Sequence, residues 1–421
     1  MNRVPTRRLI FGVALITLSG LVFGFVKRGT GSRASGKLGS AFYVWQRNWD
    51  DAVAVAVRTA PEGGLAPLIA EISWQANGRA SVIWPEVDME ALRHAGRPVS
   101  AVLRIGSCVL GRQWNAEVGR VVTAILKKLR AGGIEPVELQ VDFDCAKSQL
   151  GEYRARLAEL RRGTMPLPVR PTVLPDWISS REFSALAAES GSYVLQAHAT
   201  RKPRPDAPES ALCEAEDARK WAEQAGKLGV PFRMALPTYT YRVAFAPGGE
   251  VIGIEAEGSS RVWPAKTVMR SFRPNPAALA SLIKDWNLDR PACLEGLMWY
   301  RLPVRSDVRN WRLPTLVAVM QGRVPRPEMH VEHSGASPTD LVLVNSGDAD
   351  GVSPAQVAVA STSVIADADG VNGYRVEFPA EGGVVFLRTE HLAQERIPPG
   401  GQRPLGWLRT GGEVQIQTLL Q

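Results

Sequence analysis

Two aspartates lie two residues apart in the segment VELQVDFD, residues 137–144. Along this segment apolar residues alternate with Glu138, Gln140, Asp142 and Asp144. The alternation predicts a β-strand with two unlike faces, on which the two aspartates are about 6.6 Å apart. Neighbouring carboxyl groups can adopt different pKa values and divide the roles of proton donor and charged stabiliser. The pair is therefore a candidate catalytic site if the polar face is enclosed.

Aromatic and hydrogen-bonding side chains stand at the ends of other predicted strands. They are Trp45, Trp177, His198, Tyr239, Tyr241, Trp299 and Tyr300. Such rings suit sugars, because the C–H face of a sugar stacks on a flat ring while carboxylates accept hydrogen bonds from its hydroxyl groups. A single ring is more often buried packing, so the prediction depends on their convergence. Arg104, near the end of the strand before the aspartates, is the expected charge partner.

Eight segments have the length and composition of strands, and helical segments lie between most of them. The strand segments are 41–45, 68–73, 99–105, 137–144, 170–174, 192–198, 232–236 and 294–300. This alternation predicts a (β/α)8 TIM-type barrel over residues 41–328, with a doubly wound parallel sheet as the alternative. Each strand of such a barrel would bury both of its faces.

A barrel would place the polar row of residues 137–144 inside and its apolar row against the helices. Asp142 and Asp144 would then lie at the carboxyl end of the strand, where barrel enzymes build their active sites. Because an unpaired buried charge is strongly unfavourable, both acids need partners, water or a function. The alternative is a structural network of ion pairs at the barrel mouth. Glu138, deeper in the strand, is expected to be structural.

Two regions depart from the strand–helix alternation. After the seventh strand, YTYRVAFAPGGEVIGIEAEG contains two alternating runs around a Pro-Gly-Gly turn, which predicts an inserted β-hairpin. A hairpin partner of the second strand is expected near 78–84. From 329 to 421, short strands at close spacing alternate with Gly/Asp turns. This texture predicts a small β-sandwich appended to the barrel.

The N-terminus predicts export or membrane attachment. Three arginines among the first eight residues precede an uncharged stretch at 9–26, and Lys27 and Arg28 follow it. Eighteen mostly apolar residues are just long enough to span a bilayer. We expect residues 1–28 to anchor the protein in the inner membrane, with a cleaved export signal as the alternative. Residues 29–40 are rich in Gly, Ser and basic residues and predict a flexible linker.

Composition and cysteine spacing restrict the remaining classes. The formal charge of +8 over 421 residues permits an anionic partner without requiring one. The chain has no basic run interleaved with aromatic residues, so we expect no nucleic-acid binding. Its four cysteines match no zinc pattern, and we expect no metal or cofactor.

The cysteines could pair in an exported protein. Cys108 and Cys145 follow neighbouring predicted strands, so a disulfide between them is geometrically possible, with buried thiols as the alternative. Cys213 and Cys293 are expected to be unpaired.

The aspartate strand resembles part of a known enzyme family. LQVDFD, residues 139–144, is similar to the D-x-D-x-E strand of chitinase-type glycoside hydrolases, which are barrels that use the N-acetyl group of the substrate as nucleophile. In this resemblance Gln140 matches the first acid, Asp142 the middle acid and Asp144 the proton-donating Glu. We therefore expect Gln140 to contact the substrate. The chain thus departs at the first acid, and at the third it has the shorter Asp.

Two other strands take part in the same resemblance. GLMWYR, residues 296–301, resembles the eighth strand of those enzymes, which implies that Trp299 or Tyr300 is the ring on the floor of the sugar site. GKLGVPFRMALPTYTYR resembles their seventh strand, which is also followed by an inserted β-rich segment. The sixth strand departs, because Gln196 and His198 stand where the family has Met-x-Tyr.

A second resemblance covers about residues 40–325. AFYVWQRNW, QVDFDCAKSQLGEYRARLAELR and PFRMALPTYTYRV are similar to an uncharacterised bacterial family, the domain of unknown function numbered 3142. This resemblance implies the barrel but supplies no activity.

These features favour a membrane-anchored or exported barrel of glycoside-hydrolase type that faces the periplasm. Its expected substrate is a cell-envelope or extracellular polysaccharide. Asp144 would be the general acid, and Asp142 would orient the substrate or share a proton with it. The alternatives are a non-catalytic carbohydrate-binding barrel and an envelope scaffold whose sandwich binds a protein.

Overall fold

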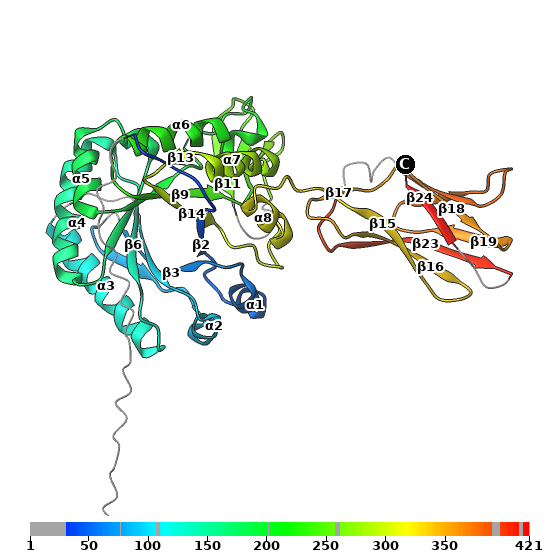
Figure 1. Cartoon of the computed structure of the whole chain (residues 1–421), viewed down its shortest axis with the longest axis horizontal. Coiled ribbons are helices and arrows are strands. Elements are labelled where there is room, and N and C mark those ends of the chain that lie inside the picture. Colours follow the sequence, from blue (N-terminus) through cyan, green and yellow to red (C-terminus); the bar gives the residue numbers. More distant parts are fainter. Residues whose placement is uncertain are drawn as a thin grey trace, which may run out of the picture.

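The computed structural model describes residues 31–420, except 76, 107–109, 111, 201, 257–261, 390–395 and 412–415. It consists of a barrel wrapped by helices and, beyond helix α8 (Leu313–Met320), a C-terminal domain built of strands (Figure 1). The predicted anchor or export segment, 1–28, lies outside the described residues. In the described part of the chain, no helix is both long and apolar enough to cross a bilayer.

Eight parallel strands close into the predicted barrel. They are β2 (Gly39–Val44), β3 (Gly64–Trp74), β5 (Ser100–Ile105), β6 (Glu138–Phe143), β7 (Val169–Val173), β8 (Tyr193–Gln196), β9 (Phe232–Pro237) and β14 (Leu294–Tyr300). Each pairs with its neighbours in that order, and β2 closes the ring by pairing with both β14 and β3. The eight predicted strands and the (β/α)8 fold are confirmed. The expected hairpin partner is β4 (Ala80–Ile83), which is antiparallel to β3.

Helices cover the outside of the barrel (Figure 1). They are α1 (Asp51–Thr59), α2 (Met89–Ala95), α3 (Arg112–Ala131), α4 (Leu150–Thr164), α5 (Arg181–Ser190), α6 (Ala215–Gly226), α7 (Pro276–Leu288) and α8 (Leu313–Met320). Local sequence sets several of their starts. The side chains of Asp50 and Asp88 accept hydrogen bonds from the first turns of α1 and α2, as N-cap residues do.

The two faces of β6 lie in different environments, as its alternation predicts. Leu139, Val141 and Phe143 are buried between the sheet and the helices, where the ring of Phe143 meets Tyr153 of α4 at 5.2 Å. Val137 precedes the strand and is exposed. The opposite face of the sheet fills the barrel interior, together with apolar residues of other strands such as Leu68.

The segment that sequence composition predicted as a flexible linker differs in the structure. Residues 33–38 run along the barrel, where β1 (Arg33–Ala34) pairs with β13 (Arg290–Pro291). Leu38 is buried, and Arg33 forms ion pairs with Glu223 and Asp289. These contacts come from residues distant in sequence, so the local Gly/Ser pattern does not reveal them.

The insertion after the seventh barrel strand is larger than the predicted hairpin. β10 (Tyr241–Phe245) and β11 (Val251–Glu255) form that hairpin, and β12 (Val268–Phe272) pairs with the other side of β10. The sheet has its own small core, which includes Tyr241, Val243 and Phe272.

The C-terminal domain contains two four-stranded antiparallel sheets around a shared core, as expected for a small sandwich. One sheet comprises β15 (Met329–Ser334), β16 (Thr339–Asn345), β23 (Gln402–Thr410) and β19 (Ile365–Gly370). The other comprises β20 (Tyr374–Glu377), β21 (Val384–Arg388), β18 (Gln356–Ser361) and β24 (Ile416–Leu420). Two short strands, β17 (Gly351–Val352) and β22 (Arg396–Ile397), pair beside them. Leu341, Phe386 and Leu408 are among the core residues.

Candidate active site

A hollow of about 230 Å³ opens at the carboxyl end of the barrel strands. Asp142 and Asp144 both line it, so the inward-facing polar row of β6 ends at an enclosed hollow. The described residues that line it are Tyr43, Trp45, Arg104, Asp142, Asp144, Thr172, Val194, Gln196, His198, Ala199, Ala235, Tyr239 and Tyr300.

Asp142 lies in the wall of the hollow near the end of β6. Its Oδ1 accepts a hydrogen bond of 2.6 Å from the hydroxyl of Thr172 on β7. Burial raises the pKa of Asp142, and the Thr172 hydrogen bond and the charge of Arg104 offset this rise only in part. Asp142 therefore holds a proton more readily than an ordinary aspartate.

Asp144 lies just beyond the end of β6, where its side chain reaches solvent at the rim. Protein still surrounds the carboxyl group closely. Desolvation raises the pKa of Asp144 to about 6, and the negative charge of Asp142 adds to the rise. Arg104 acts in the opposite sense. At pH 7 about a tenth of Asp144 carboxyl groups thus retain a proton.

Arg104 lies opposite Asp142 in the register of β5 and β6. In the described part of the chain, no ion pair joins it to either aspartate. Its guanidinium lies over the ring of Trp45, 5.8 Å from the ring centre. Arg104 therefore supplies positive charge to the hollow without neutralising one acid directly.

A second polar cluster fills the barrel interior toward the other end of β6. Glu138 accepts hydrogen bonds from Arg233 (2.6 Å), Gln140 (2.7 Å) and Ser100 (2.9 Å). Burial alone would raise the pKa of Glu138, but the charge and hydrogen bond of Arg233 reverse the shift, and the pKa is lowered. Glu138 is thus held as a paired carboxylate, in agreement with its expected structural role.

Gln140 belongs to this second polar cluster and does not line the hollow. It is fully buried, and its Oε1 accepts a hydrogen bond of 2.7 Å from the hydroxyl of Tyr43. The prediction that Gln140 contacts substrate is therefore corrected. Its position one step below Asp142 on the inner face makes it a support between Glu138 and Tyr43.

Five rings make one side of the hollow. Tyr300 contacts Trp45 edge to face at 4.9 Å and Tyr239 at 5.3 Å, and it stacks on His198 at 5.0 Å. Tyr43 meets both Trp45 and Tyr300. Desolvation lowers the pKa of His198 to about 3, so its ring is neutral at physiological pH. The structure thus brings Trp45, His198, Tyr239 and Tyr300 together as predicted.

Three predicted site aromatics lie elsewhere. Trp177 is fully buried in the layer between sheet and helices, where its ring meets Tyr153 at 6.3 Å. Trp299 points to that same outer layer, and its indole N–H donates to the hydroxyl of Ser40. Tyr241 stacks on Phe272 in the core of the inserted sheet. None of the three lines the hollow, so their predicted contact with substrate is corrected.

Sequence reasoning missed Tyr43, Thr172 and Gln196 as lining residues. Each lies in the inward-facing row of its strand. Tyr43 is two residues before Trp45, and Gln196 is two residues before His198. Thr172 lies on β7, beside the Asp142 that it hydrogen-bonds. Period-two counting from a residue known to point inward would have found them.

No cluster of three or more His, Cys, Asp or Glu side chains suited to a metal occurs among the described residues. Cys108 lies outside the described residues, so its pairing with Cys145 stays a prediction. Cys213 is a buried free thiol, and Cys293 is buried as well.

The fold and the site together define a (β/α)8 barrel with a carboxylate and aromatic cleft at the carboxyl end of its strands. The chain belongs to the family described as "Domain of unknown function (DUF3142)", whose model matches residues 95–305. A second model, "Domain of unknown function (DUF8456)", matches residues 330–411 in the C-terminal domain.

No curated protein matches the sequence. Among solved structures, the spore cortex-lytic enzyme SleL of Bacillus megaterium QM B1551 is 13% identical, with 69% of this chain and 75% of that chain covered and a TM-score of 0.47. SleL of Bacillus cereus is 11% identical with the same coverage and a TM-score of 0.48. A GH18 chitinase from Pseudoalteromonas aurantia is 11% identical, with 62% and 94% covered and a TM-score of 0.39.

Proposed function

We propose that this protein is a glycoside hydrolase in which Asp144 is the general acid. The observation that carries the proposal is the position and pKa of this carboxyl group. Asp144 stands at the carboxyl end of a barrel strand, at the rim of a polar and aromatic hollow, with its pKa raised to about 6. A general acid works best when its pKa lies near the operating pH, because it then holds a proton that it can also release.

Asp142 complements Asp144 in this role. The hydrogen bond from Thr172 fixes one of its oxygens and leaves the other free to face a substrate hydroxyl or amide N–H. Its negative charge raises the proton affinity of Asp144, and protonation of either group relieves the repulsion between them. The two acids titrate as a coupled pair, with Asp144 at the accessible end.

The shape of the hollow suits the end of a sugar chain. Ligand pockets for drug-sized molecules span about 300–1,000 Å³, and this hollow of about 230 Å³ is smaller. It therefore holds one sugar ring, with the rest of the polymer outside. The faces of Tyr239 and Tyr300 offer apolar surface to that ring, while Gln196 and Arg104 offer hydrogen-bond donors.

The N-terminal sequence motivates the proposed substrate and location. An anchor or export signal at residues 1–28 would place the barrel in the cell envelope, facing the periplasm, where polysaccharide is the abundant carbohydrate polymer. We infer a cell-envelope or extracellular polysaccharide as substrate and the inner membrane as attachment site. A reporter fused after residue 421 tests the location, and reporter activity typical of the cytoplasm would contradict it.

The test of the activity is release of reducing ends from a panel of cell-envelope glycans with and without N-acetylamino sugars. Asp144→Asn keeps the size of the side chain and removes its proton, so turnover should fall about 10²–10⁴-fold with binding nearly unchanged. The matched control is Asp176→Asn, at an exposed aspartate that follows β7 and does not line the hollow.

Two outcomes would contradict the proposal. Full turnover in Asp144→Asn would show that Asp144 does not donate the proton. Glycan binding without any release of reducing ends by the native protein would instead identify a carbohydrate-binding barrel.

A further inference from the structure

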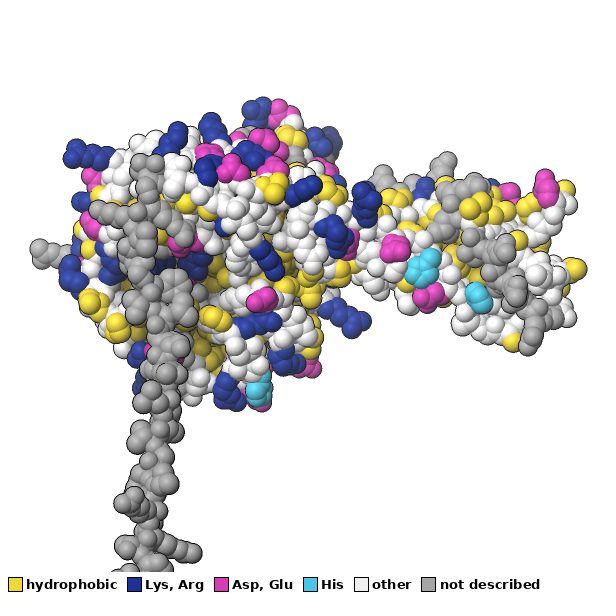
Figure 2. All heavy atoms as spheres, viewed as in Figure 1, with side chains coloured by type: hydrophobic (Ala, Val, Ile, Leu, Met, Phe, Trp, Pro, Cys, Tyr) yellow, Lys and Arg dark blue, Asp and Glu magenta, His cyan; other side chains and the backbone are white. Residues whose placement is uncertain are grey.

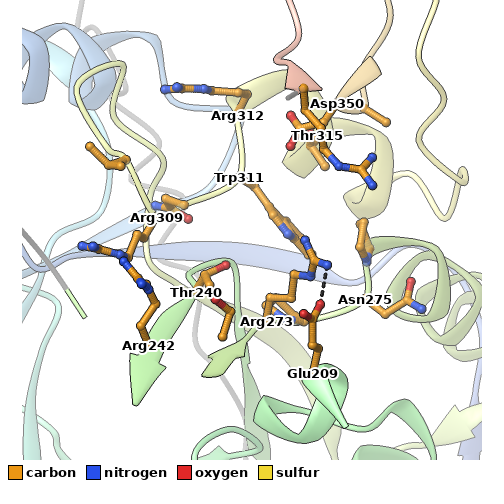
Figure 3. A pocket seen from close by; sticks show the side chains of 17 residues that line it. Glu209, Thr240, Arg242, Arg273, Asn275, Arg309, Trp311, Arg312, Thr315 and Asp350 are labelled. Atoms are coloured by element: carbon orange, nitrogen blue, oxygen red, sulfur yellow. Dashed lines mark hydrogen bonds and ion pairs between the residues drawn. The ribbon is translucent and has the colours of Figure 1, made fainter. Parts of the chain in front are cut away.

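A second hollow, of about 600 Å³, lies where the barrel meets the C-terminal domain (Figure 3). The barrel contributes the turn at Glu209, the inserted sheet, the start of α7, and the loop between β14 and α8 with the first turn of α8. The C-terminal domain contributes residues 349–350 and Arg396 of β22. Most of its lining is polar or charged and includes five arginines, Arg242, Arg273, Arg309, Arg312 and Arg396.

Hydrogen bonds hold the walls of this junction hollow together. The hydroxyl of Thr315 on α8 donates to the carbonyl of Asp348 at 2.7 Å, and the carboxylate of Asp348 accepts from the backbone N–H of Arg326 at 2.6 Å. On the barrel side, the N–H of Thr240 donates to the carbonyl of Arg309 at 2.8 Å. The two domains thus meet through defined contacts at this hollow.

Positive charge dominates the lining. Five arginines face two acids, Glu209 and Asp350, which leaves an excess of three positive charges. The buried carboxylate of Glu255 accepts from Arg309 and pairs with Arg242, so it reduces the excess to two. Arg273 pairs with Glu209 across the floor (Figure 3). Lys and Arg side chains are also prominent on the barrel edge that faces the C-terminal domain (Figure 2).

Among the described residues, Arg312 forms one side-chain hydrogen bond and no ion pair. Its guanidinium donates to the carbonyl of Arg305 at 2.8 Å, which leaves most of its five N–H donors for other acceptors. Among the described residues, no carboxylate lies within ion-pair distance of Arg312 or of Arg396 in the C-terminal domain. Guanidinium groups bind carboxylates and phosphates in a two-pronged geometry, so these arginines are suited to an oxyanion.

A flat ring and hydroxyl groups lie beside the arginines. Trp311 is half-buried in the wall and fixed by its backbone N–H, which donates to the carbonyl of Thr238. Thr240 and Ser271 add hydroxyl groups to the lining. An oxyanion alone would need only the arginines, whereas a ring to stack on and hydroxyl groups to pair with are features of a saccharide site.

We propose that the junction hollow binds an acidic saccharide, whose carboxylate or phosphate groups pair with the arginines and whose ring stacks on Trp311. The site is separate from the active-site hollow, although the two are adjacent: Tyr239 lines one and Thr240 lines the other. Both domains complete it, so ligand binding would also strengthen their junction. The proposal does not depend on hydrolysis in the barrel.

The experiment is calorimetric titration of the full-length protein with three probes. Trigalacturonate carries carboxylates, its methyl ester has the same rings without charge, and glucose 1-phosphate carries a phosphate. Trigalacturonate or glucose 1-phosphate should bind, and the tighter of the two identifies the acidic group. Affinity should fall as salt is raised, because the attraction is partly screened. Equal affinity for the methyl ester, or no binding of either acid, would overturn the proposal.

Charge reversal locates the site. Arg312→Glu should weaken binding of the acidic probe about tenfold or more, because a charged hydrogen bond becomes a repulsion. The variant should fold, since Arg312 is the N-cap of α8 and an acidic residue is favourable at a helix N-terminus. The matched control is Arg181→Glu, the same change at an exposed arginine at the start of α5, outside the lining. An equal loss in both variants would show a general charge effect and overturn the assignment.

Arg396→Glu tests the part of the lining that belongs to the C-terminal domain. It should weaken binding in the same direction as Arg312→Glu. Unchanged affinity would confine the site to the barrel and contradict its position at the junction.

Discussion

The two ends of β6 place similar side chains in opposite electrostatic situations. At the lower, amino-terminal end, Glu138 accepts hydrogen bonds from three donors, among them Arg233, and its pKa is lowered. At the upper, carboxyl-terminal end, Asp142 accepts a hydrogen bond from Thr172, and the pKa values of Asp142 and Asp144 are raised. Burial acts in the same direction on all three carboxyl groups. The difference lies in whether a guanidinium contacts the group, and it separates a structural acid from two reactive ones.

This contrast agrees with the general behaviour of barrels. Residues at the amino-terminal end of the strands mainly stabilise the fold, whereas those at the carboxyl-terminal end carry chemistry. In this chain, one strand of six residues contains both situations. The comparison therefore predicts that substitutions at the two ends change stability in opposite directions.

The largest expected effect is at the lower end. Arg233→Met removes the cation and roughly keeps the side-chain volume, so Glu138 becomes a buried charge without its cation. Because such a charge is strongly unfavourable, the free energy of unfolding should fall by about 3 kcal/mol, measured by urea denaturation. Adding Glu138→Gln to the same protein should restore part of the loss. A small effect of Arg233→Met would mean that Gln140 and Ser100 satisfy the carboxylate without it.

A smaller effect of opposite sign is expected at the upper end. The folded state raises the pKa of Asp144 to about 6, from about 3.9 in an unfolded chain. Its contribution to stability is therefore present below about pH 4 and lost as the pH rises through about 6. Asp144→Asn should raise the melting temperature at pH 7 by about 1–3 °C and leave it unchanged at pH 4. Destabilisation at pH 7 would show that the carboxylate is structural.

The smallest effect concerns the coupling between the two aspartates. Asp142→Asn removes a neighbouring negative charge, so the pKa of Asp144 should fall. Burial is the largest cause of the raised pKa, so part of the rise should remain. The pH dependence of turnover reports this shift in the limb that reflects the general acid. An unchanged limb would mean that the two groups titrate independently.

Sequence patterns predicted the barrel because its strands carry the information locally. Period-two alternation in β6 and the regular spacing of strands and helices are readable without long-range contacts. The same alternation placed Asp142 and Asp144 on the inner face. Arg33 and Leu38 illustrate the opposite case. They pack on residues that are distant in sequence, and the local Gly/Ser-rich composition does not predict these contacts.

The aromatic residues show where local pattern fails. Trp299 and Tyr300 are adjacent at the end of β14, and only one of two adjacent strand residues can point inward. The inward row contains Met298 and Tyr300, which sends Trp299 to the helices. Trp177 follows β7 in a short 3-10 turn, Pro175–Trp177, where the period of two no longer applies. The sequence identified the correct end of the barrel but not which face each ring takes.

The central claim is that Asp144 is a carboxyl group whose proton is available near neutral pH. Its most direct test is an NMR titration of the full-length protein with ¹³C-labelled aspartate carboxyl groups, in which the Asp144→Asn spectrum identifies the Asp144 signal. We predict that this signal titrates with a pKa of about 6 and that it responds to the titration of Asp142. A pKa near the ordinary value of about 3.9 would contradict the assignment of Asp144 as the general acid.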